Sequence, residues 1–195
     1  MARRPRESPV DRRARRAAVD DPAVVLDAAA RFLEVRPRSI AEVGRRLRDA
    51  GYRPDLVEAA IARLADLGML DDAAFARAWV ESRDRAHPRG ERALRAELRR
   101  KGIADAIVVA ALEDRAEPRP GGAAGAVEGD ADAAAAAALL ARRGAALLRE
   151  PDPRRRRAKA YALLARNGFD ADVCRDAVAA WLAGAAPGED AALDS

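Results

Sequence analysis

Large apolar side chains are scarce in this sequence. Aromatic residues make up 4% of the chain, and alanine supplies much of the 50% that is hydrophobic. Valine and isoleucine are sparse, and no short window alternates polar with apolar residues as a half-buried strand would. Because alanine has the highest helix propensity, the composition excludes a β-rich fold and predicts an all-α protein.

Cysteine is nearly absent, and long hydrophobic runs are absent altogether. Cys174 is the single cysteine, so an internal disulfide is excluded and a reducing compartment is expected. No stretch of apolar residues is long enough to cross a bilayer, so we expect no membrane partner. The first 21 residues carry seven arginines and lack the apolar region of a secretory signal. They are predicted to form a disordered basic tail, and the protein is expected in the cytoplasm.

Groups that carry out catalysis are equally scarce. His87 is the only histidine, and it precedes a proline in an expected turn. Cys174 lies on an apolar stripe, which fits a small buried hydrophobe better than an activated thiolate. Asp71 and Asp72 lack further oxygen ligands at the spacing of a cation-binding loop, so helix capping is the better interpretation. We therefore predict no catalytic residue, no metal site, no cofactor and no enzymatic activity.

Three segments of the chain superpose on a glycine, at Gly51, Gly102 and Gly168. A leucine stands four residues before each glycine, and an apolar residue follows each one directly. Glycine ends a helix in the left-handed conformation at little steric cost, and the apolar residue after it closes the turn. Apolar residues then recur at helical spacing. The pattern predicts a helix, a glycine turn and a second helix, three times over.

A further helix is expected before each pair, over residues 22–35, 73–84 and 132–149. Ser39 is the expected N-cap of the helix that follows residues 22–35. Asp71 or Asp72 is the expected N-cap of the helix over residues 73–84. Pro54 suits the first turn of a helix. The predicted fold is an elongated tandem array of three three-helix, helix-turn-helix-like repeats. Its expected parts are a disordered tail over 1–21, repeats over 22–70, 71–117 and 132–184, a flexible insertion over 118–131, and a second disordered tail over 185–195.

Positive charge is concentrated on the middle helix of each repeat, although the net charge of the whole chain is only +4. Residues 38–48, 89–101 and 152–166 carry net charges of +3, +4 and +5. Such helices suit phosphate groups or an acidic protein groove. Basic side chains in the last turn of a helix, however, also complement the helix dipole while staying solvated. No aromatic residue interleaves with these basic residues to stack on nucleobases. The predicted contact residues for a partner or for DNA are Arg45, Arg46, Arg48, Arg92, Arg95, Arg99, Arg100, Lys101, Arg154, Arg155 and Arg156.

Two segments of the second repeat resemble the central signature of the RecX family. They read GMLDDAAFARAWVESR over residues 68–83 and GERALRAELRRKGI over residues 90–103. The resemblance extends over residues 22–183 apart from the insertion. It implies a non-enzymatic regulator that binds the RecA nucleoprotein filament and inhibits its ATPase, strand-exchange and coprotease activities. Basic side chains would then meet RecA and, as a further contact, single- or double-stranded DNA, and we expect the protein to be a monomer.

A transcription regulator of the helix-turn-helix type is the alternative function. Each glycine turn between two helices has the outline of that motif. The helix after each turn, however, begins with acidic residues such as Asp55, Glu58 and Asp105. Acidic side chains are poorly suited to a recognition helix that lies beside phosphates. We therefore expect the filament regulator in preference to the transcription regulator.

Overall fold

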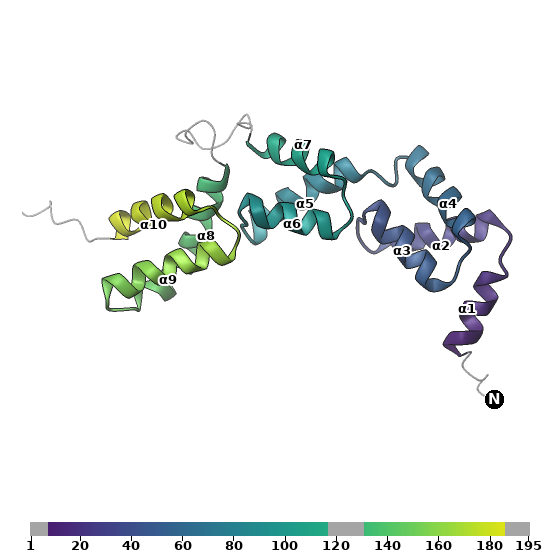
Figure 1. The fold of residues 1–195 in the computed structure, drawn as a ribbon, viewed down its shortest axis with the longest axis horizontal. Coiled ribbons are helices and arrows are strands. Elements are labelled where there is room, and N and C mark those ends of the chain that lie inside the picture. Colours follow the sequence, from purple (N-terminus) through teal and green to yellow (C-terminus); the bar gives the residue numbers. More distant parts are fainter. Residues whose placement is uncertain (1–7, 117–130, 186–195) are drawn as a thin grey trace, which may run out of the picture. The chain divides into compact units, whose positions relative to one another are not determined.

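The computed structural model describes residues 8–116 and 131–185. In these two ranges it has ten α-helices and no strand, which confirms the predicted all-α fold (Figure 1). The helices are α1 (Pro9–Ala17), α2 (Pro22–Glu34), α3 (Ile40–Ala50), α4 (Pro54–Asp66), α5 (Asp72–Ala86), α6 (Glu91–Arg100), α7 (Asp105–Ala116), α8 (Ala131–Leu148), α9 (Pro153–Arg166) and α10 (Ala171–Ala185).

The helix starts follow the local signals of the sequence. Ser39 caps α3 in a complete capping box, in which its side chain accepts from the backbone N–H of Glu42 and the Glu42 carboxylate accepts from the backbone N–H of Ser39. Of the two candidate caps of α5, Asp71 takes the role and accepts from two free N–H groups. The Asp72 carboxylate instead accepts from the backbone N–H of Ile40 at 2.9 Å. Both predicted caps are therefore confirmed, with Asp71 as the one that acts on α5.

The prediction of a disordered tail over residues 1–21 is wrong for its described part. Helix α1 begins at Pro9 with Ser8 as its N-cap, and Asp11 lies in the first turn. Cap, proline and acidic residue together favour a helix start. The predicted insertion and C-terminal tail lie outside the described residues, except that Ala131 is the first residue of α8 and Ala185 the last of α10.

The contacts divide the chain into two compact units. Unit 1 comprises Met1–Ala76 and Arg99–Ile107, and unit 2 comprises Arg77–Leu98 and Val108–Ser195. In unit 1, α2, α3 and α4 pack around buried residues that include Val25, Val43 and Leu64. In unit 2, α8, α9 and α10 pack around a second core that includes Leu140 and Phe169 (Figure 1). The predicted repeat boundaries do not coincide with these units, and they stay predictions.

The three turn glycines adopt the left-handed conformation that the sequence predicts. Their φ angles are +103° at Gly51, +80° at Gly102 and +86° at Gly168. A segment that precedes each turn in the chain packs directly against it. A Cβ on Gly102 would lie 2.4 Å from the Cβ of Ala41 in α3, and one on Gly168 would lie 2.4 Å from the Cβ of Ala93 in α6. Each of these two close approaches falls within a single unit, so the same junction is built once in unit 1 and once in unit 2.

Helix α1 occupies the corresponding place at the first turn. A Cβ on Gly51 would lie 2.6 Å from Cγ of Arg13 and 3.0 Å from its carbonyl oxygen. The guanidinium groups of Arg13 and Arg16 donate to the carbonyl oxygens of Asp49 and Ala50, each at 3.4 Å. These carbonyls belong to the last turn of α3, where cationic groups are favourable. Helix α1 is therefore held at the C-terminal end of α3.

Candidate interaction surfaces on the basic helices

The arginines of α3 lie on its exposed face. Val43 and Leu47 are 0% and 2% exposed and turn the opposite face into the core of unit 1. Arg45, Arg46 and Arg48 are exposed, and none forms an ion pair with another described residue. The Arg46 guanidinium lies 5.7 Å from the centroid of the Phe32 ring, which leaves its N–H groups available. This face presents three cationic groups, and no described acid forms an ion pair with any of them.

The basic side chains of α6 differ in whether they have acidic partners. Leu94 and Leu98 are fully buried, as their spacing predicts. Arg95 forms an ion pair with Glu91 at 2.5 Å, and Arg99 forms one with Asp105 at 2.7 Å. Both of these pairs are partly exposed and therefore contribute little to stability, but each carboxylate lowers the net charge that a partner would meet.

Arg92 and Arg100 differ from the two paired arginines of the same helix. Both are exposed, and within the described ranges neither has an acidic partner. Arg92 belongs to unit 2 and Arg100 to unit 1. They are the α6 arginines that keep their full charge for an external ligand.

Lys101 is enclosed by unit 1. Its side chain is 14% exposed, and its ammonium group lies 3.1 Å from Oε1 of Glu42 and 5.5 Å from the centroid of the Phe75 ring. Its carbonyl oxygen accepts from the buried hydroxyl of Ser39 at 2.6 Å. Burial raises the pKa of Glu42, but Lys101 and the Ser39 N–H lower it by more than burial raises it. The pKa of Glu42 therefore lies below its ordinary value. The geometry gives Lys101 a structural role at the turn of Gly102.

Helix α9 carries arginines in its first turns. Arg154 is exposed, and its guanidinium has no ion pair among the described residues. Arg155 lies 3.6 Å from Asp152, and with 77% of its side chain exposed this pair is weak. Arg156 donates to the carbonyl oxygens of Glu150 and Pro151, at 3.0 and 3.5 Å, just beyond the end of α8. Arg154 and Arg155 therefore remain accessible, whereas Arg156 ties α9 to the chain before it. One continuous basic track across α3, α6 and α9 stays a prediction.

A buried arginine that the sequence analysis missed lies in unit 2. The Arg115 side chain is 6% exposed and bridges Asp84, at 3.0 Å, and Asp132, at 2.6 Å. It also donates to the carbonyl oxygen of Arg89. Burial lowers the pKa of Arg115, but the hydrogen bonds and charges of the two aspartates raise it overall. No spacing rule links residues 84, 115 and 132, so only the tertiary structure brings them together.

Glu97 accepts a second set of hydrogen bonds in unit 2. Its Oε2 accepts from Nε1 of Trp79 at 2.9 Å and from Nε of Arg83 at 2.7 Å, and Arg83 also lies over the Trp79 ring. Burial raises the pKa of Glu97, but these two donors and the nearby Arg89 lower it below its ordinary value. Glu97 thus fixes Trp79 to α6 and is not free to interact elsewhere.

The residues considered for chemistry show no activated group. Cys174 is fully buried, and burial together with the charge of Asp170 raises the pKa of its thiol. This environment disfavours the thiolate, which is the reactive form, and it confirms the prediction that Cys174 is buried. His87 is exposed at the end of α5. In the part of the chain that the structure describes, no three His, Cys, Asp or Glu side chains gather as a metal site would require. No described helix combines the length and apolar character needed to span a bilayer.

Helices joined by left-handed glycine turns, with arginines exposed on the middle helices, define a tandem three-helix-repeat protein. Two family models match this chain. The first three-helix domain of RecX matches residues 26–64, and the second three-helix domain of RecX matches residues 71–112. The chain therefore belongs to the RecX family of regulatory proteins, and its third repeat lies beyond the two matched segments.

Relatives and solved structures agree with this assignment. A regulatory protein RecX of Mycobacterium sp. (strain KMS) is 43% identical over 84 residues, which is 43% of this chain and 46% of the relative. One of Prosthecochloris aestuarii is 38% identical over 89 residues, or 46% of this chain and 59% of the relative. The matches thus span about half the length of these curated relatives.

The likeness to solved structures extends further along the chain. RecX from Lactobacillus salivarius superposes with a TM-score of 0.68 at 21% identity, covering 84% of this chain and 98% of the other. A second crystal structure of a regulatory protein RecX gives a TM-score of 0.62 at 20% identity, covering 86% and 71%. At this level of identity the likeness establishes the fold.

Proposed function

We propose that this protein binds the RecA nucleoprotein filament and inhibits its ATPase, strand-exchange and coprotease activities. Membership of the RecX family supports this function, and the observation that carries it is the set of exposed arginines without acidic partners among the described residues. Arg45, Arg46 and Arg48 on α3 are the clearest members. Arginine binds phosphate and carboxylate groups in a bidentate way, and a filament of protein and DNA offers both.

Not every predicted contact residue serves equally well in this proposal. Arg92, Arg100 and Arg154 are exposed and lack an ion pair with any described residue, so we place them with the α3 arginines at the contact with the filament. Arg95, Arg99 and Arg155 are exposed or partly exposed but share their charge with nearby carboxylates. Lys101 and Arg156 are engaged within the fold, and we assign them to stability.

The protein acts in this proposal by binding and not by catalysis. The single cysteine is buried with a raised pKa, and the single histidine is exposed beside a turn with no described acid bonded to it. General acid–base or nucleophilic chemistry needs such groups to be paired and accessible. Regulation would therefore follow from occupancy of the filament, with no turnover of a substrate.

RecA-dependent ATP hydrolysis on single-stranded DNA tests the proposal. Purified protein is expected to inhibit hydrolysis at substoichiometric amounts, and a pull-down of RecA with and without DNA would show which of the two is the primary contact. Full ATPase and strand-exchange rates at excess protein would overturn the proposal. A footprint on one specific duplex sequence would favour the helix-turn-helix regulator instead.

The structure offers that alternative little support. The helices after the turns begin with acids that are already paired. Asp55 bonds to Arg53 at 2.6 Å, and Asp105 bonds to Arg99 at 2.7 Å. Such helix starts present carboxylates and ion pairs where a recognition helix would present donors to base edges. The arginines that we place at the contact with the filament lie instead on the helices that precede the turns.

A further inference from the structure

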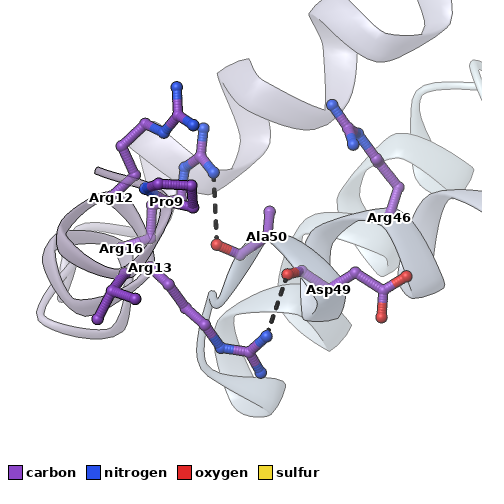
Figure 2. Close-up of a pocket in the computed structure, with 8 residues that line it drawn as sticks. Pro9, Arg12, Arg13, Arg16, Arg46, Asp49 and Ala50 are labelled. Atoms are coloured by element: carbon purple, nitrogen blue, oxygen red, sulfur yellow. Dashed lines mark hydrogen bonds between the residues drawn. The ribbon is translucent and has the colours of Figure 1, made fainter. Parts of the chain in front are cut away.

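A groove lined by arginines lies between α1 and α3 in unit 1. Its volume is about 570 Å³, and four guanidinium groups line it, from Arg12, Arg13 and Arg16 on α1 and Arg46 on α3. Asp49 is the only acidic residue among the described residues that line it. Figure 2 shows the α1 arginines on one side and Arg46 on the other. The described lining, with four cations and one anion, has a formal charge of about +3, which makes the groove an electrostatic site for anions.

Helix α1 is fixed in this position by hydrogen bonds to neutral carbonyl groups, which do not neutralise its arginines. Arg13 and Arg16 each donate one N–H to a carbonyl oxygen at the end of α3, as the dashed lines in Figure 2 mark. A guanidinium group has five N–H donors, so four on each side chain have no acceptor among the described residues. A backbone carbonyl carries no formal charge and does not neutralise the cation. The two arginines are therefore oriented but still available.

The other two arginines of the groove have no such anchor. Neither Arg12 nor Arg46 forms an ion pair with any residue of the described ranges, and both side chains are exposed. Repulsion between like charges held at one groove is unfavourable until a counter-anion binds. A ligand with two adjacent negative groups could bridge Arg12 on α1 to Arg46 on α3.

We propose that this groove binds consecutive phosphates of a nucleic-acid backbone. Phosphate oxygens match the bidentate geometry of guanidinium groups, and release of counterions from the backbone favours each contact. None of the described lining residues is aromatic, so we expect recognition that is independent of sequence and involves no base stacking. An acidic protein segment fits less well, because protein interfaces are anchored by buried apolar or aromatic side chains, and Pro9 and Val10 are the largest apolar residues that the groove offers.

This site goes beyond the proposed function because it requires no RecA. The test uses the full-length protein and a fluorescein-labelled oligothymidylate, followed by fluorescence anisotropy at several salt concentrations. The double variant Arg12→Gln/Arg46→Gln is expected to bind about tenfold more weakly at low salt. Its salt dependence should fall by about 1.4 in the slope of log K against log salt, since two phosphate contacts are lost from a single strand. The matched control is Arg63→Gln/Arg77→Gln, which removes the same charge from two exposed helix positions outside the groove.

A second variant tests the site in the opposite direction. Asp49→Asn removes the one carboxylate of the described lining and should tighten binding by about twofold or more. Far-UV circular dichroism checks that each variant keeps its helices. A duplex of the same length, used as a second probe, separates single-stranded from double-stranded DNA as the natural source of the phosphates.

Three results would overturn the proposal. The first is absence of DNA binding by the wild-type protein at low salt. The second is equal weakening by the groove variant and by the Arg63/Arg77 control, which would mean that only the total charge matters. The third is polyglutamate that competes as well as DNA of equal charge, which would assign the groove to an acidic peptide. Since RecA is absent from all three measurements, their outcome is independent of whether the protein inhibits RecA.

Discussion

The outer face of α3 and the buried network around Arg115 use the same side chain in opposite ways. Arg45, Arg46 and Arg48 are exposed and have no acidic partner among the described residues. Arg115 is 6% exposed and is held by two aspartates. A buried charge is stable only when it is paired, whereas an exposed charge without a partner contributes little to stability and keeps its attraction for outside anions. Burial and pairing therefore distinguish Arg115, which is structural, from the three α3 arginines, which are available for binding.

Removal of the Arg115 side chain should have the largest effect on stability. Arg115→Ala leaves Asp84 and Asp132 facing each other without their common cation, so the free energy of unfolding should fall by about 3 kcal/mol. Urea unfolding of the full chain measures this change. Arg115→Lys should lose less, because an ammonium group can still bond to one aspartate. If Arg115→Ala lowers the free energy of unfolding by less than about 0.5 kcal/mol, Arg115 does not differ in structural role from the exposed arginines of α3.

Lys101 and Arg100 provide a neighbouring pair for the same comparison. Lys101→Ala breaks the enclosed ion pair with Glu42 and should cost about 2 kcal/mol of unfolding free energy. Arg100→Ala removes an exposed cation from the next position and should change stability by less than about 0.5 kcal/mol. Thermal unfolding of both variants measures this difference. Equal losses of stability in the two variants would contradict a structural role that is particular to Lys101.

Glu97 connects stability to pH. Its pKa is lowered below the ordinary value of 4.5 by Arg83, Trp79 and Arg89 despite burial. The ionised carboxylate therefore stabilises the folded state above about pH 4.5, and this stabilisation is lost as the pH falls through the lower folded-state pKa. Glu97→Gln should cost about 1.5 kcal/mol at pH 7.

The acid dependence of that variant supplies the check. The difference in unfolding free energy between wild type and Glu97→Gln should stay constant near neutral pH and shrink below about pH 4.5. Chemical denaturation at a series of pH values measures it. A difference that persists unchanged well below the folded-state pKa would show that the lost contact is not electrostatic.

The exposed arginines of α3 should matter least for the fold. Replacing Arg45, Arg46 and Arg48 together by glutamine should change the free energy of unfolding by no more than about 0.5 kcal/mol per site. The effect is expected in binding, because these groups have no acidic partner among the described residues. A large loss of stability in this triple variant would place the α3 arginines with Arg115 and Lys101.

The sequence predicted the local parts of this structure well. The turns at Gly51, Gly102 and Gly168, the cap at Ser39 and the inward leucines of α6 all follow from rules that act within a few residues, and the structure confirms them. Helix α1 differs from the prediction, because the charge density of the first 21 residues favours disorder whereas the structure has a capped helix there. The cap at Ser8 is a local signal for this helix, whereas its contact with the end of α3 is a tertiary one.

The pairing of the charges could not be predicted from the sequence. Arg99 and Asp105, Lys101 and Glu42, and Arg115 with its two aspartates lie between 6 and 59 residues apart in the chain. Counting bases on a helix gives the charge of a segment but not the positions of the opposing acids. Only the folded structure distinguishes Arg100, which is exposed, from Lys101, which follows it directly and is enclosed.

Cosedimentation with RecA filaments tests the central claim most directly. Filaments are formed on single-stranded DNA with a nonhydrolysable ATP analogue, and wild-type protein is compared with the α3 triple variant Arg45→Gln/Arg46→Gln/Arg48→Gln. The wild type should pellet with the filament, and the variant should bind about tenfold more weakly or worse while unfolding at the same temperature. Wild-type protein that stays in the supernatant at saturating filament, or a variant that binds as tightly as the wild type, would contradict the account.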